Sequence, residues 1–294
     1  MFIATLIASE TLEAGDISAA ADRLAAAGAE YGGYEWIEPG VACDLRFGGD
    51  PSAVRAALES AFTGTDVIVQ READRRRRML IADMDSTMTT IECIDELADY
   101  AGIKPQIAEI TERAKRGELD FEGALDARVL LLKRLDAAVI DRCYAQRVVI
   151  MGGARELVRT MRANGADCYL VSGGFTLFAD RVAAEIGFTS ALSNILQFAD
   201  GKLSGTVARP IIGAAAKRET LLAEAAAHGL SAEQCLAVGD GANDIPMIEA
   251  AGLGVAYHAK PKTAAAAGAR IDHGDLTALL YAQGYARTDW VLEL

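Results

Sequence analysis

The chain has 294 residues, of which 51% are hydrophobic and 24% charged, a composition that excludes a disordered or fibrous protein. Its 29 Lys and Arg against 42 Asp and Glu give a formal net charge of −13, which argues against nucleic-acid binding. A bound cation is therefore expected if the ligand is a phosphate. No apolar run reaches the roughly 18 residues of a membrane span, no basic leader opens the sequence, and the five cysteines include no C-x-x-C pair. We expect a cytoplasmic protein with reduced thiols and no membrane partner.

The first 72 residues alternate short apolar runs with amphipathic segments. This pattern predicts four strands and two helices in the order βαββαβ, which is the ferredoxin-like order found in ACT-like domains. The strands are expected at residues 2–8, 34–37, 41–47 and 67–69, and the helices at 17–27 and 52–62. We therefore assign residues 1–72 to a small α+β domain and residues 73–294 to a second, larger domain.

A basic stretch, residues 71–78, joins the two predicted domains and contains four consecutive arginines, Arg75 to Arg78. Such a run could bind phosphate or nucleic acid. Because it is short and isolated, a solvated face between the domains is the better interpretation.

The larger domain begins with an apolar run at 79–82 and continues with about sixty mostly helical residues, which predict a helical cap insertion at about 90–150. Strands and helices then alternate, which indicates an α/β fold with a Rossmann-like parallel sheet covered on both faces. Further strands are expected at 168–171, 235–238 and 254–257, and helices at 155–163, 177–186, 217–227 and from 245 onward. Between these halves, two apolar runs around Asp200 and Gly201 predict a hairpin with strands at 195–198 and 203–207.

Chemically useful side chains follow three of the predicted parallel strands. Ligands of an open parallel sheet bind beyond the carboxyl ends of its strands, so these residues are expected to share one crevice. The three segments are Asp83-Met84-Asp85-Ser86-Thr87, Ser172-Gly173-Gly174 and Gly239-Asp240-Gly241-Ala242-Asn243-Asp244.

Asp83 and Asp85 are two residues apart, so in an extended backbone their side chains face the same way. Such a pair can divide the work of phosphate-ester hydrolysis. One carboxylate attacks phosphorus and the other protonates the leaving alkoxide and then deprotonates water. An isolated pair could equally belong to a turn, but the other strand ends favour the catalytic interpretation.

Oxygen ligands such as Asp83 and Asp240 suit Mg²⁺, which tends to bridge one or two carboxylates to a substrate phosphate. The hydroxyl and backbone N–H groups of the Ser172-Gly173-Gly174 segment suit the phosphate oxygens, and Lys217 could neutralise charge that develops on the transferred group. Each has a simpler alternative: Asp240 or Asp244 could cap the following helix, and Lys217 could be an ordinary surface lysine.

Together these segments resemble the four ordered motifs of the haloacid dehalogenase-like hydrolases. Within that superfamily, DMDST with nearby Glu92, the run ERAKRGELDFEGAL at 112–125, and Arg128 resemble the phosphoserine phosphatases. The resemblance covers roughly residues 79–268.

The resemblance implies a Mg²⁺-dependent hydrolase of O-phospho-L-serine that acts through an aspartyl-phosphate in the last step of L-serine biosynthesis. It implies that Asp83 is the nucleophile and Asp85 the general acid and base, with Mg²⁺ on Asp83, Asp240 and the main-chain oxygen of Asp85. The resemblance also implies that the phosphoryl group is contacted by Ser172, Gly173, Gly174 and Lys217. The site is completed by Asn243 and by Asp244, which lies behind the metal ligands. In the cap, Glu92 binds the substrate ammonium, Arg128 binds the substrate carboxylate, and Phe121 closes the pocket.

Three points stay open at this level. Lys115 stands where the family often has methionine, and it could either face outward or change substrate preference. The N-terminal domain resembles small regulatory domains, so it could bind an amino acid or form a homodimer. The alternatives to a phosphoserine substrate are another small phosphate monoester, such as phosphothreonine, phosphohomoserine or a sugar phosphate, and an amino-acid-binding regulatory protein with a vestigial site.

Overall fold

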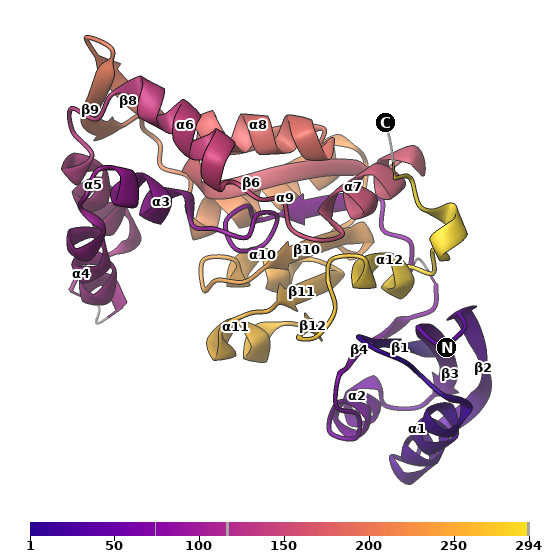
Figure 1. The fold of residues 1–294 in the computed structure, drawn as a ribbon. Coiled ribbons are helices and arrows are strands. Elements are labelled where there is room, and N and C mark those ends of the chain that lie inside the picture. The colour runs from indigo at the N-terminus through magenta and orange to yellow at the C-terminus, as the bar shows by residue number, and fades with distance from the viewer. Residues whose placement is uncertain (74, 116–117, 293–294) are drawn as a thin grey trace.

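The computed structural model describes residues 1–73, 75–115 and 118–292, except for the side chains of residues 114 and 115. The question about Lys115 therefore lies outside the described residues. Figure 1 shows a central sheet with a helical cap at one end of the molecule and the N-terminal sheet at the other. In the described part, no helix combines the length and apolar character that crossing a membrane requires.

The N-terminal unit is a four-stranded antiparallel sheet with strand order β2-β3-β1-β4 and two helices on one face. This confirms the predicted βαββαβ order. Asp50 begins the second helix by accepting a hydrogen bond from the Ser52 amide at 2.9 Å, directly before Pro51 at the first helical position. The elements are β1 (Phe2–Ala8), α1 (Ala14–Ala26), β2 (Glu30–Glu38), β3 (Ala42–Gly48), α2 (Pro51–Glu59) and β4 (Thr65–Arg71).

The second sheet has six parallel strands in the order β12-β11-β10-β5-β6-β7 and carries helices on both faces, as the alternating pattern predicts. Successive side chains of one strand enter opposite hydrophobic layers: Leu80 packs with α7, α8 and α12, and Ile81 packs with α9, α10 and α11. The strands are β5 (Met79–Ala82), β6 (Asp167–Phe175), β7 (Ser190–Asn194), β10 (Cys235–Gly239), β11 (Leu253–Tyr257) and β12 (Ala269–Ile271). The helices are α7 (Ala154–Ala163), α8 (Thr176–Ile186), α9 (Ala214–Ala227), α10 (Ile245–Ala250), α11 (Pro261–Ala266) and α12 (Ala278–Ala282).

The order of the strands reverses at β5. After β5 the chain adds β6 and β7 on one side, and later β10, β11 and β12 on the other. Such a reversal opens a crevice at the carboxyl end of the sheet, where ligands of doubly wound sheets bind. The residue that follows β5 is Asp83.

In the part of the segment between β5 and α7 that the structure describes there are four helices, and a hairpin of β8 (Leu196–Ala199) and β9 (Lys202–Val207) packs beside them. The Arg134 amide donates to the Leu203 carbonyl at 2.8 Å, which joins hairpin to cap. Asp200 and Gly201 both have positive φ, 51° and 73°, as the predicted tight turn requires. The helices are α3 (Cys93–Tyr100), α4 (Lys104–Lys115), α5 (Phe121–Leu131) and α6 (Ala137–Arg147); two 3-10 turns, η1 (Ala232–Gln234) and η2 (Arg287–Asp289), lie further along.

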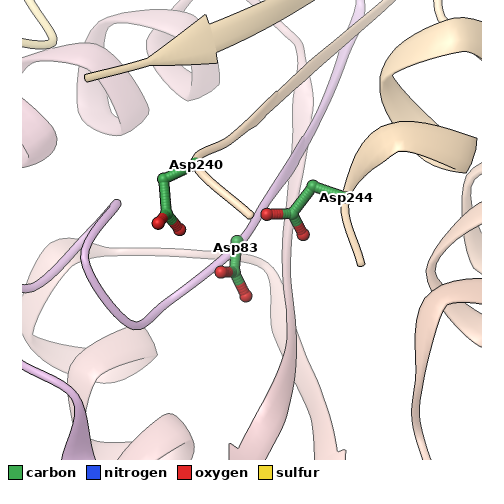
Figure 2. Close-up of side chains that lie close together, drawn as sticks. All are labelled: Asp83, Asp240 and Asp244. Carbon is green, nitrogen blue, oxygen red and sulfur yellow. The ribbon is translucent and has the colours of Figure 1, made fainter. Parts of the chain in front are cut away.

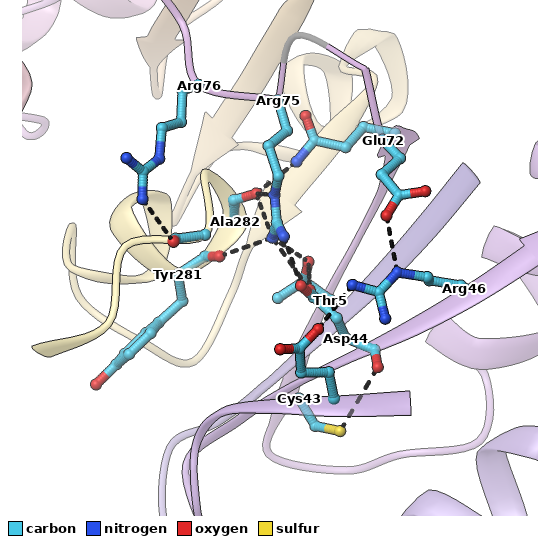
Figure 3. A network of polar contacts seen from close by, with 12 residues as sticks. Thr5, Cys43, Asp44, Arg46, Glu72, Arg75, Arg76, Tyr281 and Ala282 are labelled. Atoms are coloured by element: carbon cyan, nitrogen blue, oxygen red, sulfur yellow. Dashed lines mark hydrogen bonds and ion pairs between the residues drawn. The ribbon is translucent and has the colours of Figure 1, made fainter. Parts of the chain in front are cut away.

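The arginine run lies in the junction between the two sheets, and Figure 3 shows the contacts of Arg75 and Arg76 there. Arg75 forms an ion pair with Asp44 of β3 at 2.5 Å and donates to the Ala282 carbonyl at 3.0 Å. Arg77 is only 7% exposed and donates to the Gln70 side chain at 2.9 Å. The predicted solvated face is thus wrong for Arg75 and Arg77, because the linker passes between two surfaces that supply acceptors.

Four short elements had no recognisable pattern in the sequence: β7, β12, α11 and α12. They span between three and six residues each. At that length hydrophobic periodicity does not distinguish a strand or helix from a loop. These short elements form because they pack against longer neighbouring strands and helices.

Candidate active site

Asp83 follows β5 at the centre of the sheet and is 5% exposed. Its backbone amide donates to the Val238 carbonyl at 3.0 Å, which continues the pairing of β5 with β10 beyond the last strand residue. Its carboxylate accepts a short hydrogen bond from Lys217. The nucleophile candidate is therefore fixed at both main chain and side chain.

Lys217 is a buried lysine of α9 with no exposed surface, so the alternative of a surface lysine is excluded. Its ammonium bridges Asp83 and Asp244, and the Asp244 contact is 2.6 Å. Burial lowers the pKa of Lys217, but the two carboxylates outweigh burial and the net direction is upward. Lys217 therefore stays charged.

Asp240 and Asp244 come from the turn between β10 and α10, and their carboxylates gather with that of Asp83, as Figure 2 shows. One oxygen from each of the three residues lies within 4.8 Å of the others. Asp244 stands at the N-cap position of α10 but makes no capping bond with its side chain. It instead accepts from the Gly241 amide at 2.9 Å and from Lys217, so helix capping does not explain it.

The charge of this cluster suits a divalent cation. Three carboxylates against one ammonium leave two negative charges unbalanced. Burial and the negative charges of Asp244 and Glu92 raise the pKa of Asp240 to about 6. Burial and Asp244 also raise the pKa of Asp83, although Lys217 opposes them. An all-oxygen set with excess negative charge fits Mg²⁺, and a bound cation would relieve the repulsion that raises these pKa values.

Asp85 lies two residues after Asp83, in the segment between β5 and cap helix α3, and its charge contributes to the raised pKa of Asp83. One carboxylate oxygen accepts from the Cys93 amide at 3.3 Å. Burial and the charge of Glu92 raise the pKa of Asp85 to about 7. Such a carboxyl group can hold a proton near neutral pH and give it up during a reaction, which is the requirement for a general acid and base.

The Ser172-Gly173-Gly174 segment is extended and forms the end of β6, rather than a turn after the strand as predicted. The pairing of β6 with β7 is irregular between Val171 and Phe175, which leaves this part of the strand outside the regular ladder. The Gly174 amide donates to the Ser172 hydroxyl at 2.9 Å. A Cβ at Gly174 would lie 2.9 Å from Met84 Cε and 3.2 Å from Asp85 Oδ2, so a side chain here would displace side chains of the first motif.

Phe121 begins cap helix α5 and places its ring against two glycines of the core. A Cβ on Gly173 would lie 3.2 Å from the ring, and a Cβ on Gly213 would lie 3.0 Å from it. We call Gly173 and Gly213 the glycine pair. Phe121 thus closes the cap onto the core, with 38% of the residue still exposed.

Two cap charges were predicted to recognise the substrate, Glu92 and Arg128. Glu92 is exposed and accepts from the Ser86 hydroxyl at 2.8 Å. Burial lowers the pKa of Arg128, whereas Asp95, Glu92 and Asp85 favour its charged form. Among the described residues, the only side-chain hydrogen bond of Arg128 is from Nε to the Ala124 carbonyl at 3.3 Å, and no carboxylate pairs with it.

The remaining predicted residue, Asn243, lies half-buried between β10 and α10 with its side-chain oxygen close over Gly241. Two other residues take part in the site without having been singled out. Ser86 has a φ of 58°, unusual for a residue with a side chain, and binds Glu92. Gly213 caps α9 and contacts Phe121. Only Ser86 carried a sequence signal, since it lies inside the first motif.

Comparison with known proteins agrees with this geometry. The family model for haloacid dehalogenase-like hydrolases matches residues 78–252. A phosphoserine phosphatase from Streptomyces coelicolor is 41% identical over 242 residues, which are 82% of this chain and 59% of that protein. This chain thus spans less than two thirds of the length of that relative.

Two solved structures extend the comparison. A probable phosphoserine phosphatase from Vibrio cholerae, in its unliganded form, has a TM-score of 0.78 and 32% identity, covering 98% of this chain and 88% of that one. A phospho-aspartyl intermediate analogue of phosphoserine phosphatase has a TM-score of 0.65 and 36% identity, covering 70% of this chain and 98% of that one. The chain belongs to the haloacid dehalogenase-like hydrolase family and, within it, to the phosphoserine phosphatases.

Proposed function

We propose that this protein hydrolyses O-phospho-L-serine to L-serine and phosphate, the last step of L-serine biosynthesis. The observation that carries the choice of substrate is Arg128. It is a half-buried guanidinium without a carboxylate partner in the described part of the chain, and it lies near Asp85 and Glu92. A half-buried cation beside an exposed anion matches the carboxylate and ammonium of an amino acid.

In the first half of the reaction, a carboxylate oxygen of Asp83 attacks phosphorus and forms an acyl-phosphate bond, while the bond from phosphorus to the serine oxygen breaks. Asp85 gives its proton to that oxygen. Its raised pKa, about 7, supports this role because a substantial fraction of Asp85 is protonated at neutral pH. The relative solved as a phospho-aspartyl intermediate analogue supports the covalent step.

In the second half, the carboxylate of Asp85 takes a proton from water, and the water oxygen attacks phosphorus. The bond to Asp83 breaks and phosphate leaves. Lys217 would hold the phosphoryl oxygens through both halves, since it donates a hydrogen bond to Asp83. The Ser172-Gly173-Gly174 segment would add its hydroxyl and amides, since Gly174 lies against Met84 and Asp85 of the first motif. Asp83, Asp240 and the main-chain oxygen of Asp85 would hold Mg²⁺, with Asp244 and Asn243 behind them. When bound, this ion would neutralise charge on the phosphate.

The decisive test is release of phosphate from O-phospho-L-serine with Mg²⁺ present, by the wild type and by Asp83→Asn. We expect activity to fall by a factor on the order of 10³ or more in the variant. An Asp83→Asn protein that stays active, without deamidation of the new side chain, would refute the mechanism.

The choice of substrate is tested separately with Arg128→Ala. Loss of the buried contact with the substrate carboxylate should cost on the order of 2 to 5 kcal/mol in kcat/KM for phosphoserine. Hydrolysis of p-nitrophenyl phosphate, which has no amino-acid carboxylate, should change little. Equal losses on both substrates, or a wild type that prefers phosphothreonine, phosphohomoserine or a sugar phosphate, would overturn the assignment to phosphoserine.

A regulatory protein with a vestigial site is the second candidate. Fluoroberyllate, a mimic of the aspartyl-phosphate, distinguishes the two, because it should inhibit the enzyme and protect it against thermal unfolding. The cytoplasmic location, the homodimer and an amino-acid ligand on the N-terminal unit stay predictions.

A further inference from the structure

Asn194, the last residue of β7, has no place in the chemistry described above, yet its side chain is hydrogen-bonded to two segments of the site. It is 1% exposed. Its Nδ2 donates to the Gly173 carbonyl at 2.9 Å and to the Ile212 carbonyl at 3.1 Å. Its Oδ1 accepts from the Ile212 amide at 2.8 Å. One buried carboxamide thus ties β6 to the segment before α9.

The two segments that Asn194 joins carry the glycine pair. Gly173 is itself one partner of Asn194, and Gly213 follows its other partner, Ile212. Both glycines lie against the Phe121 ring, which would be in tight contact with a Cβ at either position, at 3.0 Å for Gly213 and 3.2 Å for Gly173. The distance between Gly173 and Gly213 therefore determines whether the Phe121 ring can pack against both glycines at once.

The hydrogen bonds of Asn194 also link it to the two segments that carry the proposed phosphate-binding groups. Gly173 lies between Ser172 and Gly174, and Gly213 is the N-cap of α9, whose Lys217 amide donates back to the Gly213 carbonyl at 3.1 Å. Within the described part of the chain, the Asn194 side chain makes its hydrogen bonds to Gly173 and Ile212 and none to Asp83, Asp85 or the acidic cluster. Any influence on catalysis must therefore pass through the segments that it holds.

We propose that Asn194 is a positioning residue that fixes the glycine pair as the docking surface for Phe121, and so couples closure of the cap to the phosphate-binding segment. A carboxamide suits this task because it donates two hydrogen bonds and accepts others in one plane. Aspartate has a similar shape but lacks both donors. It would place carboxylate oxygens against the carbonyls of Gly173 and Ile212.

The test is a double-mutant cycle between Asn194→Ala and Phe121→Ala, measured as kcat and KM for phosphoserine and for p-nitrophenyl phosphate. Because a small misplacement of reacting groups can cost about 10²-fold in rate, we expect each single variant to lose roughly 10- to 100-fold in kcat/KM. If Asn194 acts through Phe121, the double variant should lose little more than either single variant, and Gly213→Ala should reproduce the defect.

Ser193→Ala is the matched control. Ser193 is the neighbouring buried residue, 5% exposed, and its hydroxyl has no hydrogen-bond partner in the described structure. This variant should retain wild-type kinetics. If Asn194→Ala fails to fold by circular dichroism, Asn194→Asp replaces it in the same cycle.

Losses that multiply in the double variant, or an Asn194 variant with wild-type kinetics, would overturn the proposal. The inference rests on the proposed phosphatase activity, but the two can fail separately. A wild type that hydrolyses only p-nitrophenyl phosphate would refute the assignment to phosphoserine, and the cycle would still report on Asn194 and Phe121.

Discussion

Replacing Arg75 by methionine should destabilise the protein far more than the same change at Arg76, its neighbour. The Arg75 side chain is 19% exposed and that of its partner Asp44 is 5% exposed. Its guanidinium also donates to the carbonyls of Tyr281 and Ala282, at 3.2 and 3.0 Å, and these contacts appear in Figure 3. The variant would leave Asp44 buried with the Thr5 hydroxyl, at 2.7 Å, as its remaining partner.

Removing one partner of a buried ion pair typically costs about 3 to 5 kcal/mol, because the other charge stays desolvated. The Arg76 side chain is 52% exposed, lies 4.0 Å from Asp289, stacks over Tyr285 at 4.2 Å and donates to the Gly284 carbonyl at 3.2 Å. A surface pair, one stacking contact and one exposed hydrogen bond together amount to about 1 to 2 kcal/mol. Arg75→Met should therefore lose about 1 to 3 kcal/mol more than Arg76→Met.

Urea unfolding followed by circular dichroism measures this difference. In Arg75→Met, the additional change Asp44→Asn removes the orphaned charge and should restore part of the loss. Both arginine variants should keep wild-type kcat/KM while folded, because the junction lies apart from Asp83. Equal free energies of unfolding for Arg75→Met and Arg76→Met would show that the buried pair does not hold the N-terminal sheet to the core.

Two further changes test the site itself. Ser86→Ala removes the 2.8 Å hydrogen bond to Glu92, a contact usually worth about 0.5 to 1.5 kcal/mol, so KM for phosphoserine should rise about two- to tenfold while p-nitrophenyl phosphate is unaffected. A rise in KM for both substrates would mean that Ser86 instead supports the whole segment that follows Asp83. Gly174→Ala should lower the rate of phosphate release while the protein still folds, because the new Cβ would lie 2.9 Å from Met84 Cε and 3.2 Å from Asp85 Oδ2 and would displace these side chains. Wild-type turnover in this variant would show that the first motif can move aside freely.

The sequence alone was sufficient for the order of the longer elements and for the identity of the main acidic residues. Asp83, Asp85, Asp240 and Asp244 all follow apolar strands, and parallel strands bring their carboxyl ends to one edge. Periodicity likewise predicted the βαββαβ order and the hairpin at Asp200 and Gly201, because both depend on local patterns.

Tertiary structure decided the rest. Whether Lys217 is a surface lysine or a buried bridge depends on which face of α9 meets the sheet, and its 14-residue helix is too rich in alanine to show this. Arg75 is largely covered, with 19% of its side chain exposed, because Asp44 and the end of α12 contact it, although these partners lie far away in the chain. Asn194 contacts Gly173 and Ile212 across 21 and 18 residues. Composition and spacing carry no information on such contacts, because they arise only when the sheet brings distant segments together.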